Sequence, residues 1–399
     1  ANLTMTVEAG CVLQAAQEAA AAEGLLLALS LAAEGSCTIG GNLATNAGGT
    51  QVLRYGNARE QCLGIEVVTA QGEIWHGLTG LRKDNTGYDL RDLLIGSEGT
   101  LGIVTAATLK LHPRPAAVMT ALATLPSLGA CTELLALARR RLGPGLTGFE
   151  IMNTFALDLV RRHFPMQPQP LAAAPWTALV ECSGIEDEAH TAAALEAMLG
   201  EALERGVILD TAIASNLQQA RAMWHLRESI PIAQSLEGAN VKHDVSLPIS
   251  AIEEFVASTD AALARELALG AMAQRRLYDH LSDRFLRPGR QSDLLRDCLR
   301  VMAHQLFALD RIPPHAAVGE SVQALRSAGE PQLTGVANAV GRKLAALRQA
   351  ERTGPGPLGR LAAADIPTEL GIRHSLPDAL IDDLRSVWPH ADEDACLAA

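Results

Sequence analysis

The spacing of apolar and polar residues changes character about two thirds of the way along the chain. In the first part it is typical of short, half-buried strands. It predicts strands at residues 3–8, 65–70, 73–77 and 102–111, with a helix at 12–22. Gln71-Gly72 makes a hairpin of the middle two strands, and the last strand ends at His112-Pro113. We therefore expect a first domain, of α+β class, over residues 1–115.

Strands and helices alternate in the next stretch, and strands then disappear. Strands at 118–124 and 176–182 and helices at 131–141 and 188–205 predict a second α+β domain, residues 116–260. Beyond it the apolar residues take helical spacing at 263–281, 292–309, 316–328 and 333–348. This predicts an all-α domain of four or more helices over residues 261–350. A segment rich in glycine and proline then leads into a tail, 351–399.

Charge separates the same regions. The formal net charge is -12, and by count all of it lies within residues 1–260. Residues 261–350 are basic by about five charges, nearly all of them arginine, and residues 351–399 are acidic by the same amount. A basic helical block is a candidate nucleic-acid surface. The alternative is that these arginines form only a solvated helix face.

The cysteine and histidine residues bear on whether the protein contains disulfides or a metal site. The seven cysteines contain no Cys-x-x-Cys pair, which argues against a disulfide framework and favours a reducing, cytoplasmic location. The histidines show no zinc-ligand spacing, so no metal is expected. No apolar run approaches the ~20 residues of a membrane span. The chain begins at Ala1 without the features of a signal peptide, and we expect that an N-terminal part is missing.

Residues 35–57, GSCTIGGNLATNAGGTQVLRYGN, combine glycine pairs with small hydroxyl and amide side chains. Such a composition predicts a loop whose backbone can press closely against a large planar or anionic ligand. Bulges and tight turns use glycine as freely, which is the alternative. The segment is no G-x-G-x-x-G fingerprint, because no strand, turn and helix with a following acidic residue surround it. A nicotinamide-binding Rossmann domain is not indicated.

Several motifs, GGNLATNAGG, RYG, IEVVTAQGEI and TGYDLRDLLIGSEGTLGIVTAATLKLHPRP, follow one another in an order that resembles the FAD-linked oxidases of the vanillyl-alcohol-oxidase type. The chain is most similar to their D-lactate, glycolate and D-2-hydroxyglutarate dehydrogenases over residues 3 to about 260. The resemblance implies an incomplete FAD-binding domain of the PCMH type, a ferredoxin-like cap domain, FAD as cofactor and a small 2-hydroxyacid as substrate. The flavin contacts that it implies are Thr38, Ile39, Gly40, Gly41, Asn42, Ala44, Thr45, Asn46, Gly48, Gly49, Tyr55, Gly56, Ile103 and Val104.

The segment HLRESIPIAQSLEGANVKHDVSLPIS resembles the family's substrate segment, which implies that Arg227 and Lys242 hold the substrate carboxylate. The alternative is that Arg227 pairs on a helix surface and Lys242 flanks an edge strand. The family's P-R-G-G pyrophosphate loop and its G-H-x-G-D-G-N-x-H and E-H-G-I-G segments do not occur in this chain. No catalytic residue is therefore assigned, and we expect weakened flavin binding and impaired hydride transfer.

From residue 261, ALARELALGAMAQRRLYDHLSDRFL and later VANAVGRKL resemble the NusB-like domain of bacterial cytosine-5 methyltransferases of small-subunit ribosomal RNA. This implies an RNA-binding module whose contacts include Arg265, Arg275, Arg276, Arg342 and Lys343. The last two also suit the C-terminus of a helix, where cations complement the dipole. The tail resembles the start of the methyltransferase catalytic part. The S-adenosylmethionine domain itself is absent, so no methyltransferase activity is expected.

The sequence thus predicts an impaired FAD-dependent D-2-hydroxyacid dehydrogenase fused to an RNA-binding module, of unknown oligomeric state. One alternative is a non-enzymatic RNA-binding protein with a relic flavin domain. Another is a chain that does not fold cooperatively, because half a flavin domain exposes sheet edges. The join at STDAALARELALG fits a genuine fusion, a recombined gene or an assembly error.

Overall fold

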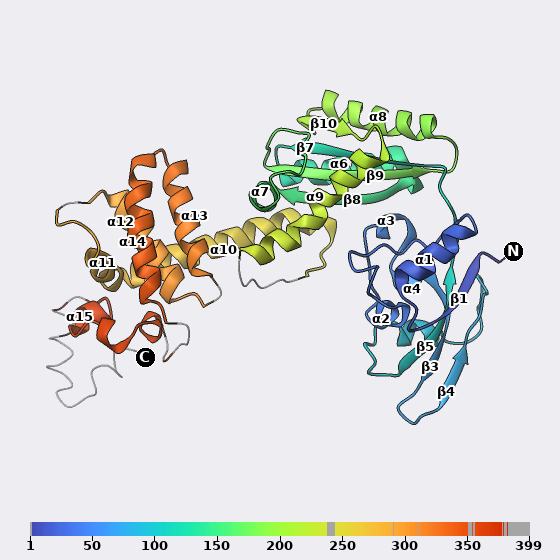
Figure 1. The fold of residues 1–399 in the computed structure, drawn as a ribbon, viewed down its shortest axis with the longest axis horizontal. Helices are drawn as coiled ribbons and strands as arrows, with labels where there is room; N and C mark the ends of the chain where they lie inside the picture. The colour runs from blue at the N-terminus through green and yellow to red at the C-terminus, as the bar shows by residue number, and fades with distance from the viewer. Residues whose placement is uncertain are drawn as a thin grey trace. The chain divides into compact units, whose positions relative to one another are not determined.

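The computed structural model describes residues 2–237, 244–289, 291–310, 312–349, 353, 356–376, 378 and 381. It contains two compact units, Ala1–Ala233 and Gln234–Ala399 (Figure 1). The first is built from strands and helices, and the described part of the second is helical. None of the helices described is long and apolar enough to cross a membrane.

The first unit opens with an antiparallel four-stranded sheet in the order β1-β5-β3-β4. Its strands are β1 (Thr4–Glu8), β3 (Cys62–Val68), β4 (Ile74–Gly77) and β5 (Ile103–Lys110). The predicted strands and the hairpin are confirmed. Ile65, Val67 and Leu109 face a core that also contains residues of α1 (Leu13–Ala22) and α2 (Ile39–Ala44). The opposite face is polar, with Thr6 Oγ1 and Thr108 Oγ1 3.0 Å apart.

The loop predicted at residues 35–57 is wrong in part, because it contains two short helices, α2 and α3 (Val52–Tyr55), followed by α4 (Ala58–Gln61). The Thr38 side chain caps α2 by accepting a hydrogen bond from the Gly41 amide at 3.3 Å. Ile39 and Leu43 are each 1% exposed and anchor this turn in the core. The cap and the burial outweigh the helix-breaking tendency of the glycines.

A second antiparallel sheet follows in the order β10-β7-β9-β8. Its strands are β7 (Ala117–Leu125), β8 (Leu146–Asn153), β9 (Trp176–Gly184) and β10 (Asp210–Ile213). The helices around it are α6 (Leu128–Leu142), α7 (Thr154–His163), α8 (Glu188–Glu204) and α9 (Leu217–Leu236). The predicted alternation of strands and helices is confirmed. A small sheet pairs β2 (Leu25–Leu26) with β6 (His112–Pro113).

The second unit packs its helices around a core that includes Tyr278, Leu299 and Phe307. The helices are α10 (Ile252–Ala273), α11 (Arg275–Asp283), α12 (Asp293–Phe307), α13 (Pro314–Ser327), α14 (Thr334–Leu347) and α15 (Leu370–Arg373). The single helix predicted at 263–281 is wrong, because Gln274 leaves helical geometry with φ -107° and ψ 22°. This bend separates α10 from α11, in which Leu277, Tyr278 and Leu281 are fully buried.

Candidate functional site

The predicted flavin contacts at residues 38–46 lie on α2 and its two ends. Ile39, Gly40 and Asn42 are buried, whereas Gly41 and Thr45 are exposed. The Gly40 amide donates to Ala9 O at 2.8 Å, and a Cβ at Gly40 would lie 2.6 Å from the Ala9 Cβ. This glycine is therefore required by the packing of α2 beside the end of β1. Gly41 has no such backbone contact, which leaves its side open to solvent or a ligand.

The second glycine pair, Gly48-Gly49, lies in a segment (residues 48–51) with polar groups that have no hydrogen-bond partner. Gly49 has φ +104°, and a Cβ there would lie 2.3 Å from the Ser30 carbonyl oxygen. Within the described part of the chain, the Gly48 and Gly49 amides donate no hydrogen bond, and Gln51 Oε1 is buried without a partner. A flavin ring offers both acceptor and donor atoms to such groups. These residues therefore fit a flavin.

The remaining predicted flavin contacts come from α3 and from the start of β5. The Tyr55 ring lies 4.7 Å from the His112 ring, and Gly56 has φ +78°. Ile103 is 61% exposed, whereas Val104 is partly buried against the core. The Gly96 and Glu98 amides donate to Leu43 O at 3.0 Å and Ala44 O at 2.9 Å. These bonds bring the turn before β5 against the end of α2.

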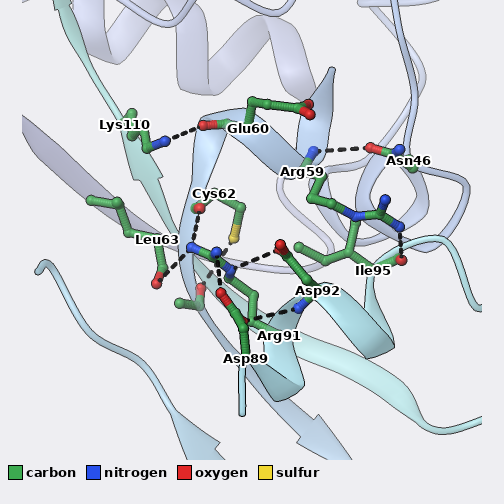
Figure 2. A network of polar contacts seen from close by, with 11 residues as sticks. Asn46, Arg59, Glu60, Cys62, Leu63, Asp89, Arg91, Asp92, Ile95 and Lys110 are labelled. Atoms are coloured by element: carbon green, nitrogen blue, oxygen red, sulfur yellow. Dashed lines mark hydrogen bonds and ion pairs between the residues drawn. The ribbon is translucent and has the colours of Figure 1, made fainter. Parts of the chain in front are cut away.

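A polar network that the sequence did not reveal holds the loop in place (Figure 2). Asn46 adopts φ +48°, and its Oδ1 accepts from the Arg59 amide at 3.0 Å. Arg59 Nη2 then donates to Ile95 O at 2.6 Å, beyond α5 (Leu90–Leu94). The network thus fixes Asn46, one of the predicted flavin contacts. The Arg59 guanidinium binds a backbone carbonyl 36 positions along the chain, and no local motif predicts such a contact.

Arg227 and Lys242 are not both placed by the structure. Arg227 lies on α9, and its Nε donates to Glu150 Oε2 at 2.9 Å, so Arg227 does form an ion pair, but with a residue of strand β8 and not on a helix surface. The Arg227 side chain remains 32% exposed, and its Nη groups form no hydrogen bond or ion pair among the described residues. Lys242 lies outside the described residues. Arg227 is therefore oriented, and both of its Nη groups keep their N–H donors.

A buried carboxyl group beside α9 was also missed by the sequence. Glu181 on β9 is 8% exposed and accepts from Trp224 Nε1 at 2.7 Å and from Thr147 Oγ1 at 3.2 Å. It lines a cavity of about 350 Å³ together with Trp224 and Arg221. Burial raises the pKa of Glu181 although the hydrogen bonds oppose the rise. The one sequence feature that could have predicted this buried carboxyl group is the single glutamate inside the apolar run TALVEC.

The raised pKa of Glu181 predicts a pH-dependent stability of the first unit. Because the folded state holds this proton more tightly, stability is full below the unfolded pKa of about 4.3 and falls as pH rises through the folded value. We expect Glu181→Gln to flatten this decline, measured as the urea midpoint between pH 4 and 8. Glu196→Gln, at an exposed position on α8, is the control. An unchanged pH profile in Glu181→Gln would contradict the assignment.

The predicted RNA contacts in the second unit do not form one cluster of unpaired cations. Arg275 lies 3.8 Å from Asp279, and Arg276 Nη2 donates to both Asp378 oxygens at 3.0 and 3.1 Å. Lys343 lies over the Phe285 ring at 5.4 Å. Arg265 and Arg342 are exposed without a described partner. Arg342 and Lys343 precede the last turn of α14, so the dipole explanation given as the alternative is weakened.

A buried polar chain connects α10 with the core of the second unit. Tyr278 Oη and His304 Nδ1 are 3.1 Å apart, and His304 Nε2 lies 3.4 Å from Glu266 Oε1. His304 is 4% exposed, and burial lowers its pKa. Gly270 packs directly on its ring, since a Cβ there would lie 2.1 Å from Cε1. This contact fixes where α10 meets α12.

The comparisons with known proteins agree with both resemblances. Residues 1–77 match the FAD binding domain, and residues 114–285 match the C-terminal domain of FAD linked oxidases. Residues 229–346 match the NusB family, so this match and that of the oxidase C-terminal domain overlap across α10. The chain therefore carries FAD-linked oxidase domains over its N-terminal two thirds and a NusB domain in its C-terminal region. The domain matches support FAD as the cofactor.

The named relatives of the first part are dehydrogenases. The chain is 39% identical over 280 residues to bovine mitochondrial D-2-hydroxyglutarate dehydrogenase, covering 70% of this chain and 50% of the relative. It is 42% identical over 260 residues to D-2-hydroxyglutarate dehydrogenase of Xanthomonas citri pv. viticola, covering 65% and 54%. The chain thus spans about half the length of the curated relatives it matches. An alkyldihydroxyacetonephosphate synthase structure aligns with a TM-score of 0.45 and 16% identity over 59% of this chain and 43% of its own, too weak a likeness to carry an argument.

Proposed function

We propose that the N-terminal two thirds of the chain is an FAD-dependent oxidoreductase acting on a small D-2-hydroxyacid. The observation that carries the proposal is the loop at residues 48–51, where two free amides and a buried, unpartnered Gln51 oxygen fit a flavin. The matches to FAD-linked oxidase domains support the same cofactor. FAD supplies the acceptor for the substrate's hydride. The 2-hydroxyacid is inferred from the names of the relatives.

In this proposal the second sheet and its helices form a ferredoxin-like cap that carries the substrate contact. Glu150 holds Arg227 through Nε, so the two Nη groups can bind a carboxylate bidentately. The family segments that supply an acid–base group do not occur in the sequence. We therefore propose that hydride transfer is slower by about 10²–10⁴ than with such a group present.

The substrate proposal predicts stereospecific bleaching of bound FAD. With the protein loaded with FAD and kept without oxygen, we expect D-2-hydroxyglutarate to reduce the absorbance near ~450 nm and the L enantiomer to leave it unchanged. Arg227→Lys is expected to weaken substrate binding by about 10-fold or more, because the bidentate contact is lost. Arg140→Lys, at an exposed position of α6, is the control. Equal bleaching by both enantiomers would contradict the proposal.

A second candidate function, RNA binding by the second unit, is favoured by the match to the NusB family. Arg342 and Lys343 are exposed on α14 and are the contacts we propose for phosphate groups. We expect the chain to shift a ribosomal RNA fragment at low salt, and Arg342→Gln with Lys343→Gln to reduce the salt dependence of Kd by about one unit of slope per residue. Arg326→Gln on α13 is the control. A slope equal to that of the unchanged chain would exclude this surface.

A further inference from the structure

We propose that the first unit has a second binding site, for a phosphate or carboxylate group, formed by Arg82, Arg91 and Lys110 at the β4 edge of the first sheet. These three side chains line a cavity of about 410 Å³ between the β4 edge and residues 78–91. The inference goes beyond the proposed oxidoreductase function, because neither the flavin loop nor Arg227 lines this cavity.

Lys110 reaches this cavity from the side of the sheet opposite the flavin loop. Leu109 points into the core that α2 helps to form, so its neighbour Lys110 points to the opposite face of β5. Thr6 and Thr108, joined on the polar face, have the same orientation as Lys110. Lys110 would therefore approach a ligand from the face of the sheet turned away from α2, whereas Trp75, which packs against the core, lines the cavity from the β4 edge.

Arg91 lines the cavity, and Figure 2 shows the polar contacts that hold its guanidinium. Its Nη1 donates to Cys62 O at 2.8 Å, Nη2 to Asp89 at 2.6 Å and Nε to Asp92 at 3.2 Å. Its position is thus fixed before any ligand binds. Such preorganisation lowers the entropy lost on binding.

Arg82 and Lys110 have backbone partners in place of carboxylates. Arg82 Nη2 donates to Leu3 O and Leu111 O, both at 3.3 Å, and Lys110 Nζ donates to Glu60 O. Among the described residues neither cation forms an ion pair. Each keeps further N–H donors for a ligand.

The charges around the cavity repel one another. Burial and then the nearby Arg91 and Arg82 guanidinium groups lower the pKa of Lys110. The lining carboxylates are already engaged, Asp89 by Arg91 and Asp84 by Thr86. Asp89 and Asp92 both pair with Arg91, so the cavity-lining cations without a carboxylate partner among the described residues are Arg82 and Lys110. An oxyanion placed between Arg82 and Lys110 would offset the repulsion between these two cations.

The size and lining of the cavity indicate a small organic anion or a free oxyanion. Its volume lies within the range of small-molecule sites, about 300–1,000 Å³. Trp75 and Leu81 supply apolar contacts beside the three cations, and Tyr88 stands 95% exposed at the same cavity. A phosphate or carboxylate group would pair with the cations while the rest of the molecule packs against these side chains.

The test is calorimetric titration of the full chain with inorganic phosphate and, separately, with citrate, each against chloride at equal ionic strength. We expect saturable binding of at least one of the two probes, and a 10-fold or greater rise in its Kd for the double variant Arg82→Met with Lys110→Met. Lys83→Met removes one positive charge from the loop that carries Arg82 without lining the cavity and is expected to leave Kd within 2-fold. Absence of saturable binding with both probes, or an equal loss in Lys83→Met, would overturn the proposal.

A second measurement on the unchanged chain covers the case in which the double variant fails to fold. Amine acetylation followed by mass spectrometry reports how reactive each lysine is. We expect the probe that binds to protect Lys110 several-fold while Lys83 stays equally reactive. Equal acetylation of Lys110 with and without either probe would overturn the site without reference to flavin binding.

Discussion

We expect Gly49→Ala to abolish the retention of FAD by the first unit and to lower its stability. Position 49 has φ +104°, which L residues rarely adopt, and the new Cβ would lie 2.3 Å from the Ser30 carbonyl oxygen. That oxygen also accepts from the Thr50 amide at 3.1 Å, so relief of the clash must move the loop. Backbone strain of this kind costs about 1–3 kcal/mol. The free amides of Gly48 and Gly49 would then leave their positions.

The control for this variant is Gly10→Ala, in the same unit. Gly10 has no positive φ, and no atom lies within 4 Å of its added Cβ. We expect its urea midpoint and its retained absorbance near ~450 nm to match those of the unchanged chain. Normal FAD retention and an unchanged midpoint in Gly49→Ala would show that the loop geometry does not hold the flavin.

The second large effect is expected in the helical unit, where Gly270→Ala should destabilise and Gly319→Ala should stabilise. The added Cβ at 270 would lie 2.1 Å from the His304 ring, which cannot move freely because Tyr278 and Glu266 hold its two nitrogens. Overpacking of this kind costs about 1–3 kcal/mol. At exposed Gly319 on α13 nothing lies within 4 Å, so alanine gains up to about 1 kcal/mol of helix propensity.

Both effects are measured as thermal or urea midpoints of the helical unit, followed by circular dichroism at 222 nm. Opposite signs for two chemically identical changes would locate the effect in the contact between Gly270 and His304. A loss of stability in both variants, or in neither, would contradict the packing of α10 against α12.

The strands and most helices could be predicted because each is marked by local apolar periodicity. The Gln71-Gly72 hairpin is an example, since its turn residues and flanking alternation lie within a few positions of one another. Local composition failed at α2, where glycines suggested a loop but the Thr38 cap and two buried side chains impose a helical turn. It failed again at Gln274, where burial of α11 bends the chain.

The parts of the candidate sites that could not be predicted depend on distant partners. In the sequence, Glu181 is a single charged residue in an apolar strand. The hydrogen bonds from Trp224 and Thr147 that explain its burial are seen only in the folded structure. The resemblance predicts Arg276 as a phosphate contact, yet its guanidinium donates to the carboxylate of Asp378, about a hundred positions later. The resemblance found the flavin loop as a set of residues. The free amides of this loop and the unpartnered Gln51 oxygen follow only from the folded backbone, because no sequence motif marks them.

The most direct test of the central claim is the absorption spectrum of the purified chain after incubation with FAD and removal of free cofactor. We predict bands near ~370 and ~450 nm that remain with the protein, because the segment of residues 48–51 offers hydrogen-bond donors and an acceptor that fit a flavin. A colourless protein with intact circular dichroism would contradict the claim that this chain is a flavoprotein, and RNA binding by the NusB domain would then be the function left to test.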